Sequence, residues 1–448
     1  MLIRSARRFS TKTPIHSRVL ILGSGDAGTS TAKMLAQHSS WPMSDVRMID
    51  PSKRYWYQSF QTCVGAGIFP AWLINFSKSW IIPRNVIQVE ASVQEVDPEN
   101  KLVKCDDGNT YSFDALVMAT GIQIRPDLVK GLPEAFEDKD CPVGTNYIPK
   151  YAIKYCKLRD QFKGGRALFT APSAFIKCGG APQKIMYLSS ESWTKKKIGH
   201  TNEFISGGAK FFPNEFYEGA LLKVAKSYGV VPHLNCDLVE VRSKERIAVF
   251  KNLTTGELIE KKFDVMHATP PQRPAPFIAQ SKLGSANGYV EVDRNTLQHK
   301  RYSSVFALGD NADLPTSKTA STLNEQSYVV AKNLISYLND KPITEKYNGY
   351  TACPVFVGGH KLMLCEFGYD GQTMPTFLND QRKPRYSFYL LKLLGFPTSY
   401  LILGPNAIRN SRHFFLDFKD RVNRLLSCAK GCKSKAGTSA TNSGNNKL

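Results

Sequence analysis

Apolar and polar positions along the first fifty residues alternate in blocks that are typical of an α/β unit. Residues 19–22 read VLIL, a short apolar run, and residues 29–37 carry small and apolar side chains at helical spacing. A glycine-rich loop separates the two blocks, within SRVLILGSGDAGTS at residues 17–30. The pattern predicts a strand, a tight turn and a helix, followed by a second strand at 46–49.

The glycines of this loop have the spacing G-x-G-x-x-G. In a strand–turn–helix setting, Gly23 permits the tight turn, Gly25 lets the backbone approach a pyrophosphate, and Gly28 lets helix and strand lie close together. The helix N-terminus then faces the phosphates. A glycine turn in an ordinary α/β unit is the alternative, but the whole context favours a dinucleotide site.

Three further residues extend this predicted site. Asp26 and Ala27 lie between the second and third glycines, at the start of the helix. Asp50 ends the second strand, about 20 residues beyond the last glycine, where an acid accepts hydrogen bonds from a ribose. We therefore expect Asp26, Ala27 and Asp50 to bind the cofactor.

The rest of the chain predicts more α/β structure. Residues 86–121 alternate apolar and polar positions around a DDGN turn, which indicates antiparallel strands ending at FDALVMATG. A second strand–loop–helix unit begins near residue 166, but its loop lacks G-x-G-x-x-G, so a pyridine nucleotide is not expected there. Residues 303–319 predict a buried strand and a loop, followed by a helix to residue 338. The segment 341–380 predicts two more strands.

Length and charge add two conclusions. A chain of 448 residues is long enough for two or three domains. The formal net charge of +21 is concentrated at the two ends and not in a nucleic-acid module, so nucleic acid is not an expected partner.

Residues 1–17 are basic, contain Ser and Thr and lack acids, which is typical of a mitochondrial transit peptide. A disordered basic arm is the alternative.

The C-terminal region predicts amphipathic helices. No apolar run there reaches the 18 or so residues of a spanning helix. Apolar side chains recur at helical spacing through 414–426, and between residues 381 and 435 the only acids are Asp417 and Asp420. This pattern favours a helix lying in a membrane interface, and a helix docked on the protein's own core or on a second subunit is the alternative. Residues 427–448 predict a disordered tail.

The ten cysteines are scattered, with no C-x-x-C pair that would indicate a zinc or thioredoxin-type site, and no metal is expected. Cys428 and Cys432 lie in the polar tail and are interpreted as surface thiols. In a reducing compartment most of the ten should be buried or idle. Any cysteine chemistry must therefore combine residues that are distant in the sequence.

Several longer stretches resemble one family. They are YQSFQTCVGAG, IKCGGAPQKIMYLS, HATPPQRP, TLQHKRYSSVFALGDNADLPTSKTA and YNGYTACPVFVGG. Together with GSGDAG and the MATG and ALGD strand ends, they resemble the mitochondrial type of sulfide:quinone oxidoreductase, within the flavoproteins that have two dinucleotide-binding domains. The resemblance covers residues 18–400. Ser59, where the family commonly has proline, and the extra thiol Cys63 are departures.

The resemblance implies an α/β fold with two Rossmann-like domains of the disulfide-oxidoreductase flavoprotein type. We expect an FAD domain from 18–145 and 270–338, a second Rossmann-like domain at 146–269, and a membrane-associating helical region at 339–426. It also implies non-covalent FAD. The further residues expected to bind FAD are Gln58, Val93, Gly121, Asp310, Lys318 and Thr319.

The resemblance also implies a catalytic pair, Cys178 and Cys353. A disulfide, or a bridge through one more sulfur, would be attacked by hydrosulfide to give a persulfide and a free thiolate. The family suggests that Cys353 carries the persulfide and Cys178 addresses the flavin, and the reverse order stays open. Lys177 and the helix after Pro182 are expected to favour the Cys178 thiolate.

The implied partners are hydrogen sulfide, ubiquinone, a small sulfur acceptor (glutathione, sulfite, coenzyme A or cyanide) and a membrane surface, with localisation at the mitochondrial inner membrane. Two other classes compete. A rotenone-insensitive NADH:quinone dehydrogenase would need a second glycine fingerprint near residue 170, which the sequence lacks. A flavoprotein that uses FAD only to stabilise a partner-binding fold would be reduced by neither sulfide nor NADH.

Overall fold

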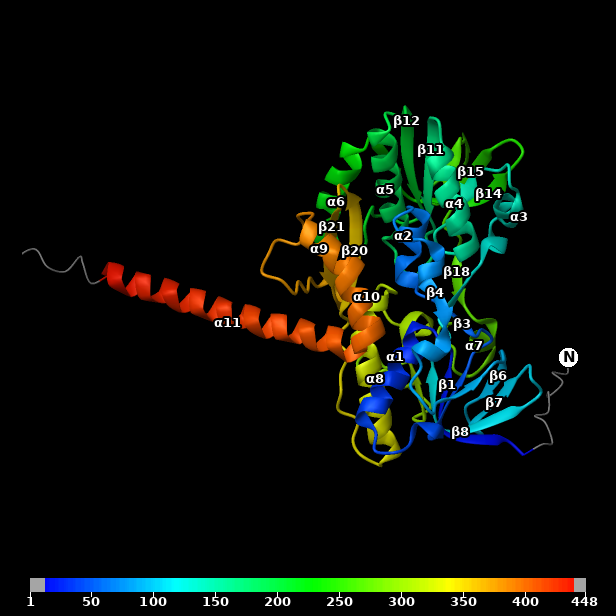
Figure 1. Ribbon diagram of the computed structural model, residues 1–448, viewed down its shortest axis with the longest axis vertical. Helices are drawn as coiled ribbons and strands as arrows, with labels where there is room; N and C mark the ends of the chain where they lie inside the picture. Colours follow the sequence, from blue (N-terminus) through cyan, green and yellow to red (C-terminus); the bar gives the residue numbers. More distant parts are fainter. Residues whose placement is uncertain (1–12, 439–448) are drawn as a thin grey trace, which may run out of the picture.

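Two separate sheets form the body of the protein (Figure 1). This computed structural model describes residues 13–438, with side chains described as far as Arg424. The first sheet lies at one end of the long axis, around β1 and β8, and the second lies at the other end, around β11 and β12. The mixed α/β architecture predicted from the sequence is confirmed.

The first sheet has seven strands in the order β5-β2-β1-β8-β7-β6, with β19 paired to β8. Strands β1, β2, β5, β8 and β19 are parallel, and β6–β7–β8 is an antiparallel meander. The bounds are β1 (Ile15–Leu22), β2 (Val46–Ile49), β5 (Ile87–Val89), β6 (Val93–Asp97), β7 (Leu102–Cys105), β8 (Thr110–Met118) and β19 (Val305–Ala307). The strand at 46–49 and the antiparallel strands before Gly121 are as predicted.

Helices α1 (Asp26–His38) and α8 (Leu323–Leu338) contact each other and cover this sheet. They bury their apolar faces on a continuous core that includes the fully buried run at 19–22. The predicted helix ending at residue 338 is confirmed, and its first turn is a 3₁₀ turn at Ala320–Thr322. Burial on both faces explains why these parallel strands read as apolar runs.

The second sheet has the order β10-β17-β11-β12-β13 and is parallel throughout. A three-stranded antiparallel sheet, β14-β15-β16, accompanies it. The strand bounds are β10 (Val143–Gly144), β11 (Gly165–Ala171), β12 (His200–Ser206), β13 (Val230–His233), β14 (Cys236–Arg242), β15 (Ile247–Asn252), β16 (Leu258–Lys262) and β17 (Val265–His267). The helix bounds are α3 (Leu132–Glu137), α4 (Pro149–Gln161), α5 (Ala181–Lys195) and α6 (Glu215–Ser227). Because β10 pairs with β17, this unit starts before the expected boundary at 146.

Shorter elements join the two units. Strand β9 (Ile122–Ile124) pairs with β18 (Gln272–Pro274), where the chain enters and leaves the second unit. Helix α7 (Pro276–Gln280) follows β18. Strands β20 (Thr351–Gly358) and β21 (Lys361–Phe367) form a hairpin that contacts α5. They are the two strands predicted in the segment 341–380.

The aromatic, glycine-containing stretch at 53–68 has regular structure. It forms strand β3 (Arg54–Trp56), paired with β4 (Asn75–Ser77), and then a short helix α2 (Gln61–Gly65). Helix α2 contacts α4 and α5. Packing against these helices therefore gave helical structure to a glycine-containing sequence with no helical period of its own.

The C-terminal region is helical and partly irregular. It runs through α9 (Tyr386–Leu390), a π-helical turn η9 (Leu391–Gly395), α10 (Phe396–Thr398), a second π-helical turn η10 (Ser399–Leu403) and α11 (Pro405–Thr438). Helix α11 extends away from the body (Figure 1). Within residues 13–438, no helix is both long enough and apolar enough to cross a membrane.

Two predicted boundaries change at the ends of the chain. Strand β1 begins at Ile15, so the expected end of the transit peptide at residue 17 falls inside a strand of the folded domain. Helix α11 continues to Thr438, so residues 427–438 of the predicted disordered tail are helical. Residues 1–12 and 439–448, on which the rest of those two expectations falls, lie outside the described residues.

The glycine loop folds as its spacing predicted. Gly23 has φ +97°, and a Cβ on it would lie 2.4 Å from the Ala119 carbonyl oxygen, so the turn requires glycine. A Cβ on Gly28 would lie 1.9 Å from the Gly23 carbonyl oxygen, because α1 starts directly against β1. A Cβ on Gly25 would meet no atom within 4 Å. The turn at Gly23 and the close packing at Gly28 are thus as predicted, and the approach of a pyrophosphate to Gly25 stays a prediction.

The substitution Gly28→Ala should destabilise the protein, because the added methyl group cannot fit between helix and strand. We expect a loss of at least about 3 kcal/mol in the free energy of unfolding, measured by denaturant titration of the apoprotein. Gly25→Ala is the matched control and should leave apoprotein stability nearly unchanged. Equal stabilities for the two variants would contradict this account of the turn.

Candidate functional site

A cavity of about 620 Å³ lies between the two sheets, the β20–β21 hairpin and the C-terminal helices. This volume is in the range of small-molecule and cofactor sites. Most of the predicted site residues line it: Gly23, Gly25, Asp26, Ala27, Asp50, Gln58, Gly121, Cys178, Asp310, Lys318 and Thr319. The structure therefore brings together residues that are up to about 300 positions apart in the sequence.

Three predicted residues are not among those lining the cavity. Gly28 lies behind the loop, as its packing role requires. Val93 pairs with Cys105 in the β6–β7 meander and contacts the core of the first sheet, so the structure does not place it at the cavity. Cys353 is fully buried on β20, directly behind the cavity wall, where it meets Cys178.

At the glycine end, the cavity offers what a dinucleotide needs. Gly25 faces open space at the N-terminus of α1, so backbone can approach a phosphate there. The Asp50 carboxylate accepts hydrogen bonds from the backbone N–H of Ser24 at 2.8 Å and of Ser52 at 2.9 Å. It also pairs at 2.5 Å with Lys78, a buried lysine that the sequence analysis did not single out. These partners hold Asp50 at the ribose position of the fingerprint.

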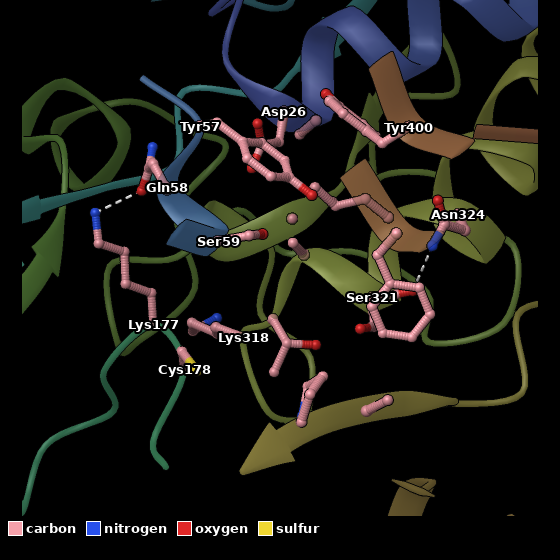
Figure 2. Close-up of a pocket in the computed structure, with 18 of the residues that line it drawn as sticks. Asp26, Tyr57, Gln58, Ser59, Lys177, Cys178, Lys318, Ser321, Asn324 and Tyr400 are labelled. Carbon is pink, nitrogen blue, oxygen red and sulfur yellow. Dashed lines mark hydrogen bonds between the residues drawn. The ribbon is translucent and has the colours of Figure 1, made fainter. Parts of the chain in front are cut away.

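Asp26 is the one acid inside the glycine loop, and Figure 2 shows it above the ring of Tyr57. Burial raises the pKa of Asp26 to about 6, and the hydrogen bond donated by the Tyr55 hydroxyl opposes that rise. The Tyr55 hydroxyl also lies 3.3 Å from that of Tyr400, which belongs to η10. This contact ties the cofactor loop to the C-terminal region.

The backbone at Cys178 is held in an unusual conformation. Its φ is +50°, a left-handed value that a non-glycine residue adopts only at a cost in free energy. Its N–H donates to the Lys318 carbonyl at 2.6 Å, and its own carbonyl accepts from Ala181 N–H at 2.7 Å and from the Tyr147 hydroxyl at 3.2 Å. These bonds fix the direction in which the thiol points.

Cys178, Cys353 and Lys184 form a buried triad. The two thiols, both free in the structure, are hydrogen-bonded to each other, and the Lys184 ammonium donates to the Cys178 sulfur at 3.1 Å. The hydrogen bond from Cys353 and then the charge of Lys184 hold the pKa of Cys178 well below its usual range, although burial opposes them. The same hydrogen bond raises the pKa of Cys353. The Cys178 sulfur is therefore the thiolate of the pair.

Lys177 does not have the role that the sequence predicted for it. Its ammonium donates to the Gln58 side-chain oxygen at 2.7 Å, and Figure 2 shows it directed along the cavity away from the Cys178 sulfur. Lys184 stabilises the thiolate instead. Because α5 begins at Ala181, its first turn places the Lys184 ammonium group next to the Cys178 sulfur. The neighbour in sequence is thus not the neighbour in space.

A second buried lysine approaches from the C-terminal region. Lys392, on η9, lies 5.0 Å from the centre of the Phe60 ring. Burial lowers the pKa of Lys392 to about 8, and the nearby charge of Lys184 also lowers it. Its ammonium group can therefore release a proton near neutral pH, which makes it a candidate acid or base at the cavity.

Cys63 has none of the features that activate Cys178. It is fully buried on α2, and burial raises the pKa of its thiol to about 11. The charges of Lys392 and Lys184 act in the other direction without overcoming burial. Cys63 is therefore a buried structural thiol.

The part of the cavity next to the C-terminal helices is apolar with one polar wall. Its apolar side chains include those of Phe356, Leu364, Phe377, Leu391, Phe396, Ile408 and Phe415. On the polar wall, the buried Glu366 carboxylate accepts from Tyr350 at 2.5 Å, from both N–H and hydroxyl of Thr376, and from Gln381 at 2.6 Å. The Arg412 guanidinium lies 3.5 Å from the centre of the Tyr350 ring. This chamber suits a flat, largely apolar molecule with polar edges.

Sequence reasoning missed Lys184, Lys392, Lys78 and Glu366. Only Lys184 carried a visible signal, as the polar residue in IKCGGAPQK that faces the cysteine once a helix starts at Ala181. The other three depend on contacts between distant segments. Their burial could not be read from a sequence in which most lysines and glutamates are exposed.

The second sheet does not present an equivalent nucleotide site. At the carboxyl end of β11, the Ser173 N–H donates to the Asp237 carboxylate at 2.7 Å, and the Ser173 hydroxyl donates to it at 2.5 Å. A Cβ on Gly207, at the end of the neighbouring β12, would lie 2.0 Å from the same carboxylate. The Asp237 carboxylate therefore occupies the position at which a pyrophosphate would need free backbone N–H groups.

Known proteins resemble this chain over nearly its whole length. Residues 17–155 match the pyridine nucleotide-disulphide oxidoreductase family. The mitochondrial sulfide:quinone oxidoreductase of Schizosaccharomyces pombe is 35% identical over 92% of this chain and 94% of its own, and that of Mus musculus is 35% identical over 89% and 90%. The Aquifex aeolicus sulfide:quinone oxidoreductase structure shares the fold, with a TM-score of 0.73 at 15% identity over 87% of this chain and 92% of its own.

The triad generates a prediction that needs no substrate. Lys184→Met keeps the length of the side chain but removes the charge, so the pKa of Cys178 should rise by at least about one unit. The pH dependence of Cys178 alkylation by iodoacetamide, followed by peptide mass spectrometry, measures this shift. Lys177→Met is the matched control and should change the profile much less. An unchanged profile in Lys184→Met would show that the lysine does not stabilise the thiolate.

Proposed function

The chain belongs to the mitochondrial-type sulfide:quinone oxidoreductases, and we propose that Cys178, Cys353 and Lys184 carry out the sulfide chemistry of that activity. As a member of this family, it is an FAD-dependent oxidoreductase that oxidises sulfide and reduces a quinone. The buried triad is the observation that supports the proposal, because it places a stabilised thiolate beside a second thiol at the wall of the cofactor cavity.

The residues of the glycine end fit FAD. Gly25 and the N-terminus of α1 would bind the pyrophosphate, Asp50 the ribose, and Asp310 with Lys318 and Thr319 the ribityl chain. When bound, FAD accepts two electrons from the sulfur chemistry and passes them to quinone.

In the proposed sulfide step, hydrosulfide attacks a bridge between Cys178 and Cys353. One S–S bond breaks and one forms, which leaves Cys353 as a persulfide and Cys178 as a thiolate. Lys184 stabilises the thiolate as it leaves, because its ammonium group already donates to that sulfur. The lowered pKa of Cys178 makes it the better leaving group, which favours the persulfide on Cys353.

The persulfide must then give up its outer sulfur. A small nucleophile such as glutathione, sulfite, coenzyme A or cyanide takes the sulfane sulfur and leaves Cys353 as a thiolate. Loss of two electrons from the two thiolates, for which FAD would be the acceptor, restores the bridge. The sulfur transfer takes place beside Lys184, whose positive charge stabilises the Cys178 and Cys353 thiolates.

We propose that ubiquinone enters through the apolar chamber at the C-terminal side. Leu391, Phe396 and Tyr400 line the cavity here. Lys392 reaches the same cavity with a pKa lowered to about 8 by burial, so it can donate a proton to a reduced quinone oxygen and be recharged at neutral pH.

We further propose that the protein lies on the mitochondrial inner membrane through its C-terminal region. Exposed apolar side chains, among them Leu394, Phe414 and Phe418, follow the outer side of this region. The neighbouring Arg421 and Lys419 provide positive charge for anionic lipid. The basic segment that precedes β1 is the proposed targeting peptide.

Replacing either catalytic cysteine tests the proposed chemistry. Cys178→Ser and Cys353→Ser should each lower sulfide-dependent ubiquinone reduction by several orders of magnitude, because no other group can take over the covalent step. Their FAD content should stay normal. Steady-state rates with sulfide and with NADH as donors measure the effect.

Cys63→Ser is the control and should retain most of the activity, because Cys63 is a buried thiol with a raised pKa. Near-native turnover in Cys178→Ser or Cys353→Ser would refute the mechanism. Reduction of the bound flavin by NADH instead of sulfide would favour the dehydrogenase class.

Surface variants test the membrane face better than a truncation after Gln381 would. Such a truncation removes the buried side chains of Phe388, Lys392 and Tyr400, so it would damage the core. The double variant Phe414→Ser/Phe418→Ser should instead reduce flotation with liposomes roughly tenfold while FAD content is kept. Undiminished flotation would mean that α11 does not contact the membrane.

A further inference from the structure

Two tryptophans are exposed on the β3–β4 side of the molecule, away from the sulfur chemistry. Trp72 is 73% exposed and Trp80 is 78% exposed, and Leu73 beside them is 46% exposed. The other three tryptophans differ, because Trp41 and Trp193 are buried and Trp56 is half-buried. The two tryptophans lie on 3₁₀ turns that flank β4, at Ala71–Ile74 and Lys78–Trp80, and this segment together with β3 is called the β3–β4 hairpin below. Two large apolar rings exposed to water on it require an explanation.

A chain of ring contacts connects these tryptophans to the C-terminal region. The Trp80 ring is stacked on Phe76 at 5.9 Å, and Phe76 lies 5.1 Å from Tyr55. The Tyr55 hydroxyl contacts that of Tyr400 at 3.3 Å. Two residues further along η10, Ile402 is 77% exposed, so these ring contacts link the hairpin to an exposed apolar part of the C-terminal region.

The apolar core beneath the two segments is also shared. Half-buried side chains at 68–71, just before Trp72, belong to the same apolar cluster as those at 393–401. Outside this cluster lie Leu394 and Leu403, which are 63% and 61% exposed. The exposed apolar side chains of the hairpin and of the C-terminal region therefore rest on one shared apolar cluster.

Charge on the hairpin matches an anionic lipid surface. Between residues 51 and 89 the sequence contains no Asp or Glu, and its charged residues are Lys53, Arg54, Lys78 and Arg84. Arg54 and Arg84 are exposed. Tryptophan with flanking cations is the composition of segments that lie at the level of lipid headgroups. The same positive, acid-poor character marks residues 381–416.

We propose that the β3–β4 hairpin is a second membrane-contacting element, which inserts Trp72 and Trp80 into the lipid interface beside the C-terminal region. The inference rests on the membrane attachment given under the proposed function. Contacts on both sides of the C-terminal cavity entrance orient the protein on the bilayer, so that the apolar chamber opens toward lipid.

Intrinsic fluorescence of the full-length holoenzyme tests this directly, because only Trp72 and Trp80 are strongly exposed. Vesicles of phosphatidylcholine and phosphatidylglycerol with brominated acyl chains should quench the fluorescence relative to the same vesicles without bromine. Trp72→Phe/Trp80→Phe should remain bound in flotation but lose this quenching. Trp72→Ser/Trp80→Ser should bind vesicles roughly tenfold more weakly.

Val231→Ser/Leu258→Ser is the matched control, since it removes two exposed apolar side chains from the second unit and should leave binding unchanged. A wild-type protein that floats with vesicles but is not quenched would overturn this inference and leave the C-terminal attachment intact. A wild-type protein that does not float would refute the proposed membrane attachment itself. Self-association that depends on Trp72 and Trp80, without quenching, would assign the hairpin to a second copy of the chain and overturn the inference.

Discussion

The contact of one buried ammonium group with two buried thiols is the constraint on which the site depends. Moving a lysine charge out of water costs several kcal/mol unless an opposite charge is close. Lys184 meets this condition only if Cys178 is a thiolate and Cys353 lies beside it, and the three residues come from α5, the loop before it and β20. The position of the β20–β21 hairpin against the second sheet is therefore coupled to the charge state of the site.

This coupling explains why the local structure around Cys178 departs from ordinary geometry. A left-handed residue is unfavourable by itself, but its hydrogen bonds to Lys318, Ala181 and Tyr147 join both units of the protein to that one backbone position. The thiol is thus aimed by groups that belong to separate parts of the fold. A flexible loop could present the same sulfur but could not keep it within reach of a fixed partner.

Sequence reasoning was most successful where a local pattern carries its own physical cause. The spacing of the glycines predicted a tight turn at Gly23 and close helix–strand packing at Gly28, and the Cβ contacts at those two positions match these roles. It failed where the cause is tertiary. Lys177 adjoins Cys178 in the chain, yet helix geometry places Lys184 over the sulfur, and burial of Lys392 depends on a segment more than 200 residues away. The irregular helix around 391–403 likewise has no period that a sequence pattern could reveal.

That irregularity has a consequence for how the two substrates are kept apart. A regular α-helix has 3.6 residues per turn, so side chains three or four positions apart share one face. A π-helical turn is wider and is often found at functional sites. Within η9 and η10, Lys392 and Tyr400 are buried at the cavity, while Leu394 and Ile402, two positions later in each case, are exposed. The cavity wall and the outer apolar surface are therefore two sides of one thin segment. In the proposed arrangement, a quinone would reach the chamber through this segment, whereas the sulfur triad lies at the wall formed by α5 and β20. The sulfur and quinone reactions would then share electrons without sharing a binding site.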